Sequence, residues 1–198
     1  MPLPLQVLLL VLVTLLSSCS PSPEGCVIEG VVRDKAYEGG TVRLCNPYTA
    51  AASDSASVRD GKFSFKPGEG TSNVRLLVLK ASDDDLFPIT LPVVTENGRI
   101  QVVLGETVFT SGTPLNDRMQ DFLLAVDRFS DKMSGSGKEA VEIRTDFAKL
   151  LEASILQNLD NRVGVYIFRA YSSRLSPECR AGILEKAGEE FRKEIETE

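Results

Sequence analysis

The sequence predicts an α+β protein, in which an N-terminal antiparallel β-sandwich or partly open barrel of about eight strands precedes a helical C-terminal region. Two observations carry this prediction. Between residues 26 and 112, short apolar or alternating segments are separated by turn residues, as in sheets built from short strands. From Gly112 onward, apolar residues recur at steps of three and four, which is the period of a helix with one buried face.

The β region contains a series of segments with the length and composition of strands. They cover residues 26–33, 41–45, 55–58, 62–65, 74–79, 87–94, 99–104 and 107–110. We expect the first two to pair as a hairpin, and the next two to pair through the turn at Asp60-Gly61. Segment 87–94 contains Pro88 and Pro92, which cannot donate to a ladder, so it is predicted to be an edge strand or a bulged one.

The helical region is predicted to contain helices over residues 113–133, 138–158 and 161–173, and a fourth from residue 176. Thr113 can cap the first helix, and Pro114 suits its first helical position. One apolar stripe follows along this helix: Leu115, Met119, Phe122, Val126, Phe129 and Met133. Because such a stripe is stable only when it is packed, we expect the helices to pack on the β region.

The N-terminus carries a sorting signal. The uncharged apolar run from Leu3 to Leu16 is shorter than the about 20 residues of a transmembrane helix and suits the apolar part of a secretory signal. It ends in Leu16-Ser17-Ser18-Cys19, which resembles a bacterial lipobox, so the resemblance implies cleavage before Cys19 and diacylation of its sulfur. Two acyl chains are enough for stable membrane anchoring. An ordinary cleaved signal and an uncleaved anchor are the alternatives.

These features divide the chain into a signal peptide (1–18), a Pro/Ser tether (19–25), an antiparallel β domain (26–112) and a helical region packed on it (113–198). The expected location is the cell envelope. By analogy with lipoproteins that are released from the inner membrane, Ser20 after the acylated cysteine favours the outer membrane, facing the periplasm.

The composition excludes several kinds of site. The chain has no histidine, so it cannot build a Ser–His or Cys–His catalytic pair or a zinc site that uses histidine. A net charge of −6 argues against nucleic acid as a partner, because phosphates require a basic surface. No metal site and no cofactor are predicted. The aspartates at 83–85 lack the spacing of a calcium loop and are expected to lie in a solvated loop.

Three cysteines follow Cys19, and no two of them form a Cys-x-x-Cys pair. In an oxidising compartment two of the three could form a disulfide. Cys26 and Cys45 are the favoured pair because they begin and end the expected hairpin. Strict alternation would place them on opposite faces of the sheet unless a bulge intervenes, so the pairing stays open. Cys179 lies in an apolar helical stripe, which favours a buried, unreactive thiol.

Three stretches carry a family resemblance: residues 27–32 (Val-Ile-Glu-Gly-Val-Val), 54–65 around the Asp60-Gly61 turn, and 111–117 (Ser-Gly-Thr-Pro-Leu-Asn-Asp). Their order resembles the "domain of unknown function 4369" family. The resemblance implies the N-terminal part of envelope lipoproteins whose C-terminal part is a thioredoxin-like oxidoreductase of the TlpA/ResA type. The sequence given contains no such Cys-x-x-Cys domain, so no catalytic residue is carried over.

The function expected from the sequence is that of a non-catalytic binding or interaction module in the envelope, held to the membrane through Cys19 and contacting a partner protein. One alternative is an accessory domain that docks a separate thioredoxin-like thiol–disulfide oxidoreductase. A second alternative is an enzyme with a carboxylate or lysine site that has no recognisable pattern. A concave, charged pocket with converging carboxylates would favour the enzyme, and a flat apolar patch over the C-terminal helices would favour docking.

Overall fold

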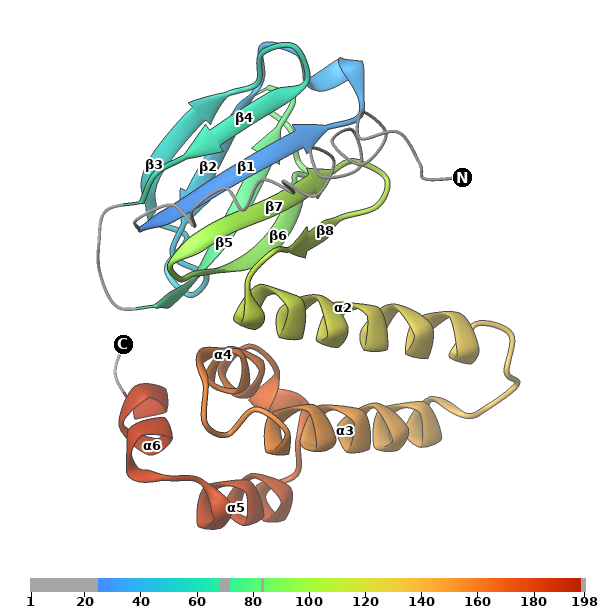
Figure 1. The fold of residues 1–198 in the computed structure, drawn as a ribbon. Coiled ribbons are helices and arrows are strands. Elements are labelled where there is room, and N and C mark those ends of the chain that lie inside the picture. Colours follow the sequence, from blue (N-terminus) through green and yellow to red (C-terminus); the bar gives the residue numbers. More distant parts are fainter. Residues whose placement is uncertain (1–24, 68–71, 83, 197–198) are drawn as a thin grey trace, which may run out of the picture.

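The computed structural model describes residues 25–67, 72–82 and 84–196. In this part of the chain, eight strands form two four-stranded sheets, and five α-helices follow (Figure 1). The predicted α+β class is therefore confirmed. Of the two predicted architectures the sandwich is correct, because the sheets do not close into a barrel.

The first sheet has the order β4-β1-β7-β8, with β4 over Lys62–Phe65, β1 over Cys26–Val32, β7 over Gly98–Leu104 and β8 over Phe109–Ser111. The second sheet has the order β3-β2-β5-β6, with β3 over Ala52–Ser57, β2 over Thr41–Cys45, β5 over Asn73–Lys80 and β6 over Ile89–Thr95. One pair departs from the predicted antiparallel arrangement. β1 and β7 run parallel, from Cys26 opposite Gly98 to Val32 opposite Leu104.

The predicted hairpin of residues 26–33 and 41–45 is wrong, since β1 and β2 lie in different sheets. The same holds for β3 and β4. The turn at Asp60-Gly61 exists, with both residues at positive φ and with hydrogen bonds in both directions between the backbones of Arg59 and Lys62. It carries the chain from one sheet to the other instead of closing a hairpin. The Glu38 carboxylate fixes this crossing by accepting from the N–H groups of Asp60 at 2.8 Å and Gly61 at 2.9 Å.

The sandwich core is made by the inward residues of both sheets, as the strand periodicity predicts. Its fully buried members include Ile28, Val42, Leu77, Leu79, Leu91, Ile100 and Leu104. Phe63 and Phe65 also point inward, with ring centroids 5.9 Å apart. Gly30 is opposite Phe63 in the ladder, and a Cβ at this position would overlap the Phe63 ring. Glycine is therefore required at residue 30 for this aromatic packing.

Five helices gather at one end of the sandwich (Figure 1). They are α2 (Pro114–Met133), α3 (Ala140–Leu156), α4 (Arg162–Tyr171), α5 (Pro177–Lys186) and α6 (Glu189–Glu196). The predicted fourth helix is two helices, because the backbone is extended at Ala187 and Gly188 follows before α6 begins. None of the helices in the described residues has the length and apolar character needed to cross a bilayer.

The helices enclose a second hydrophobic core that includes Met119, Leu151, Ile155, Ile167 and Ile183, all at 0% exposure. An aromatic series extends this core along α2 and α3. The Phe122 ring packs edge-on against Tyr171, with ring centroids 5.7 Å apart. The Phe147 ring contacts both Tyr171 and Phe129. The predicted stripe of α2 is therefore buried in its first half, at Met119 and Phe122, and only partly buried beyond.

Asn116 joins α2 to the edges of both sheets. It is fully buried, its Oδ1 accepts from the Val94 N–H at 3.0 Å, and its Nδ2 donates to the Val94 carbonyl at 2.8 Å. The Thr110 hydroxyl of β8 donates to the same Oδ1 at 3.1 Å, and Gln120 Oε1 accepts from the Thr110 N–H at 2.9 Å. The Asn116 amide thus takes the place of a neighbouring strand along β6, which is an edge strand as Pro92 predicts.

Candidate binding surfaces

Four residues form a row across the outer face of the first sheet, which none of the helices α2 to α6 covers in Figure 1. The ladder places Val31 of β1 opposite Lys62 of β4 on one side and Val103 of β7 on the other, and Val103 is opposite Phe109 of β8. Val31 is 45% exposed and Phe109 is 41% exposed, and both are absent from the two cores. We call Lys62, Val31, Val103 and Phe109 the outer-face row.

A hollow of about 790 Å³ lies beside this row. It is bounded by residues of β1, β4 and β7, by Ala56 and Ser57 of β3, and by the connection that carries Arg59. The next row along the strands is polar, with Glu29 opposite Gln101, and Glu29 forms an ion pair with Arg99. The outer face therefore combines an apolar strip with a basic flank at Lys62 and Arg59.

The second candidate surface is a pocket of about 360 Å³ between the sandwich and the helices, which we call the junction pocket. It is lined by the β2–β3 connection, β5, α4 and α6, through Asn46, Pro47, Tyr48, Asn73, Val74, Arg75, Arg162, Val165, Arg169 and Glu194. The Arg169 guanidinium lies over the Tyr48 ring, 3.6 Å from its centroid. Burial raises the pKa of the Tyr48 hydroxyl, and the Arg169 charge opposes part of this rise.

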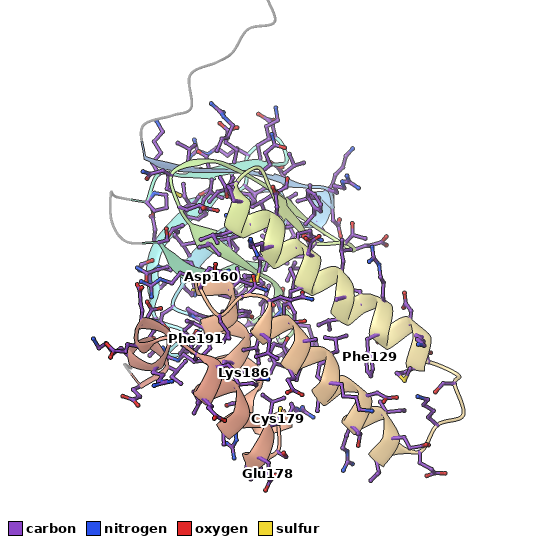
Figure 2. All side chains as sticks on the ribbon, turned by 60° about the horizontal axis from the view of Figure 1, so that its bottom comes forward. Phe129, Asp160, Glu178, Cys179, Lys186 and Phe191 are labelled. Atoms are coloured by element: carbon purple, nitrogen blue, oxygen red, sulfur yellow. The ribbon has the colours of Figure 1, made fainter. Side chains whose placement is uncertain are left out.

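An acidic groove of about 660 Å³ continues from the junction pocket, with Arg162, Val165 and Glu194 as the wall common to both. Asp160 from the α3–α4 connection and Phe191 from α6, both labelled in Figure 2, line this groove. Glu189 and Glu190 at the start of α6 add two more carboxylates. The pocket and the groove together thus have a basic end and an acidic end.

The structure places the predicted cysteines apart. Cys19 lies outside the described residues. Cys26 begins β1 in the first sheet and Cys45 ends β2 in the second, so the hairpin on which their pairing was based does not exist, and Cys26, Cys45 and Cys179 are free thiols. Burial raises the pKa of all three thiols, and Glu152 adds to the effect at Cys179. A raised pKa keeps a thiol protonated and weakly nucleophilic at neutral pH.

Asp85, one of the aspartates of the predicted solvated loop, and Asp146 of α3 have local roles. Asp85 accepts from the N–H groups of Ala81 at 3.1 Å and Phe87 at 3.0 Å, and these bonds lower the pKa of its carboxyl. It therefore shapes the β5–β6 loop. Asp146 forms an ion pair with Lys138 after the α2–α3 connection. Within the described residues, no group of acidic residues and cysteines has the arrangement of a metal site.

Sequence reasoning missed the junction pocket and Asn116. Arg75 on β5 is far in the chain from Arg162 and Arg169 on α4, and two arginines on one helix do not by themselves indicate a site. For Asn116 a signal existed, because it belongs to the stretch 111–117 that carries the family resemblance. The same stretch supplies Asp117, whose Oδ1 accepts from the Gly112 N–H at 3.1 Å. This stretch therefore joins α2 to the sheets.

Comparison with known proteins agrees with the resemblance. A model of the family described as "Domain of unknown function (DUF4369)" matches residues 26–119. The match covers both sheets and ends in the first turns of α2, so it includes Asn116. No curated protein and no solved structure gives a match to this chain. Residues 26–119 of the chain belong to the DUF4369 family.

Proposed function

We propose that this protein is a lipid-anchored, non-catalytic binding module of the cell envelope, and that it docks a partner protein on the outer-face row. The observation that carries the proposal is the apolar strip formed by the exposed Val31 and Phe109 and the partly buried Val103, beside a hollow of about 790 Å³. Contiguous exposed apolar surface in a folded domain is typical of an interaction site. The partner has an apolar contact surface, and its carboxylates face the basic flank at Lys62 and Arg59.

The anchoring part of the proposal rests on the lipobox-like stretch that ends at Cys19. Replacing Cys19 with alanine is expected to release the protein from the membrane fraction and to abolish labelling by a radioactive fatty acid. The reason is that removal of the acyl chains removes the whole membrane affinity of the anchor. Cys179→Ala is the matched control and should fractionate like the wild type. A Cys19→Ala protein that stays in the outer membrane would contradict the anchor.

The docking part can be tested with a photo-crosslinking amino acid placed at Val31 or at Phe109, in cells that express the anchored protein. We expect both positions to give the same discrete crosslinked product, and a crosslinker at the exposed Arg144 of α3 to give none. Val103→Asp should remove the product, because a carboxylate in the middle of the strip prevents apolar contact. The proposal fails if the Arg144 position gives the same product or if Val103→Asp leaves it unchanged.

The alternative of an accessory domain for a thioredoxin-like oxidoreductase predicts a particular partner in the same crosslinking experiment. If the protein is an accessory to a separate oxidoreductase, the crosslinked partner will contain a thioredoxin-like Cys-x-x-Cys motif. The raised pKa values of Cys26, Cys45 and Cys179 support a partner as the source of any redox activity. A partner without such a motif removes this alternative and keeps the binding module.

A further inference from the structure

The junction pocket concentrates positive charge in an acidic protein. The whole chain has a net charge of −6, yet Arg75 of β5 and Arg162 and Arg169 of α4 line one pocket of about 360 Å³. The one carboxylate among the described lining residues, Glu194, forms an ion pair with Arg162. Within the described part of the chain, neither Arg75 nor Arg169 forms an ion pair with a carboxylate. Two guanidinium charges are therefore left for a ligand.

Arg169 is held in place before any ligand arrives. Arg169 stacks on Tyr48, 3.6 Å from the ring centroid, which fixes the guanidinium plane and leaves its N–H edge for an acceptor. Tyr48 is itself fixed, because Asn46 Oδ1 accepts from the N–H groups of Tyr48 at 2.8 Å and Thr49 at 3.1 Å. Because the side chain is already ordered in the folded protein, binding a ligand costs less conformational entropy. Such a site therefore binds more tightly than flexible side chains would.

The chemistry of the pocket selects a carboxylate. A planar guanidinium donates two parallel hydrogen bonds to the two oxygens of a carboxylate or to a phosphate. Carbon atoms of Pro47, Val74 and Val165 line the same pocket, and these suit an organic stem next to the anionic group. Beyond the Arg162–Glu194 wall, the groove carries Asp160, Glu189 and Glu190. Their charges repel a ligand with several negative groups and attract a cationic one.

From this arrangement we infer that the junction pocket binds the carboxylate of a peptide, with the preceding residues of that peptide lying in the acidic groove. Arg75 and Arg169 hold the carboxylate, and Arg162 with Glu194 separates it from the groove. The partly buried Leu115 and Leu159 give the groove an apolar surface for the peptide, next to the buried Phe191, labelled in Figure 2. The carboxylate can be the C-terminus of the peptide or the side chain of an aspartate. This site is separate from the outer-face row and does not depend on the docking proposal.

The test uses the full-length protein, ¹⁵N-labelled and in detergent micelles, with three peptides as probes. They are N-acetyl-Ala-Lys-Ala with a free C-terminus, the same peptide as its C-terminal amide, and N-acetyl-Ala-Lys-Asp-amide. We expect saturable shifts of the Tyr48, Val74 and Arg169 amide signals with a carboxylate peptide, and at least tenfold weaker binding of the Ala-Lys-Ala amide. Whichever of the two carboxylate peptides binds more tightly identifies the source of the carboxylate.

Matched variants locate the binding. We expect at least a tenfold loss of affinity for the carboxylate peptide in Arg75→Gln and in Arg169→Gln. Arg144→Gln makes the same change of charge on the exposed face of α3 and should leave the affinity unchanged. Arg169→Lys should also weaken peptide binding. Lysine keeps the positive charge, but it has no planar guanidinium to stack on Tyr48 and to donate two parallel hydrogen bonds. The inference is overturned if inorganic phosphate binds as tightly as the peptide, if the peptide amide binds equally well, or if both glutamine variants bind like the wild type.

Discussion

Replacement of Asn116 with alanine is expected to lower the free energy of unfolding by about 3–5 kcal/mol, since each buried polar group left without a partner costs about 1–3 kcal/mol. The Asn116 amide forms hydrogen bonds with both the N–H and the carbonyl of Val94, and it also accepts one from the Thr110 hydroxyl. Val94 and Thr110 are both fully buried, so water cannot reach them without local opening. Urea unfolding followed by circular dichroism measures the loss.

Asn161→Ala is the matched control for this experiment. Asn161 caps α4 by accepting from the Val163 N–H at 3.0 Å, and the loss of an N-cap costs only about 1 kcal/mol. If Asn116→Ala costs no more than Asn161→Ala, the contact between α2 and the sheet edge contributes little to stability. The junction would then be held by apolar packing alone.

Replacement of Phe122 with alanine is also expected to cost about 3–5 kcal/mol, which is the usual loss for a buried phenylalanine. Phe122 is 3% exposed and belongs to the helical core, where its ring meets Tyr171 with centroids 5.7 Å apart. Alanine would remove both the buried area and this edge-on contact. The same denaturant melts measure the change.

Phe129→Ala makes the same substitution seven residues further along α2. Phe129 is only partly buried and contacts Phe147, with centroids 5.2 Å apart, so we expect a loss of about 1–2 kcal/mol. In Figure 2, Phe129 lies towards the far end of the α2–α3 pair, away from Phe191. Equal losses at Phe122 and Phe129 would mean that the two halves of α2 are buried alike, which would contradict the structure.

The sequence could predict where strands and helices lie because periodicity records which face of each segment is buried. Pro114 at the start of α2 and Pro92 in an edge strand are examples in which one residue type has few permitted places. Partner choice was not predictable in the same way. β1 shows an inward face at Ile28, but that face fits β2, β4 or β7 equally well. The sequence therefore predicts pairing with the nearest segment, and this hairpin is wrong.

The candidate surfaces were harder to predict than the fold. Val31, Val103 and Phe109 are ordinary strand residues, and only the register of two ladders places them side by side. Arg75 and Arg169 line the same pocket because β5 and α4 lie together at the junction. The two arginines are far apart in the chain. Asn116 sits in a polar first turn, where the helix pattern by itself indicates exposure, and its burial depends on the sheet edge that it meets.

The parallel pairing of β1 with β7 also constrains the order of folding. β1 has no partner among the residues that directly follow it, since its neighbours are β4 at Lys62–Phe65 and β7 at Gly98–Leu104. Closing such long loops is slow compared with forming a local hairpin or a helix. In a chain that emerges N-terminus first, β1 therefore stays unpaired until β4 is available, and it gains its second neighbour only when β7 follows. The strand nearest the proposed anchor thus completes its pairing late, after all four strands of the second sheet have emerged.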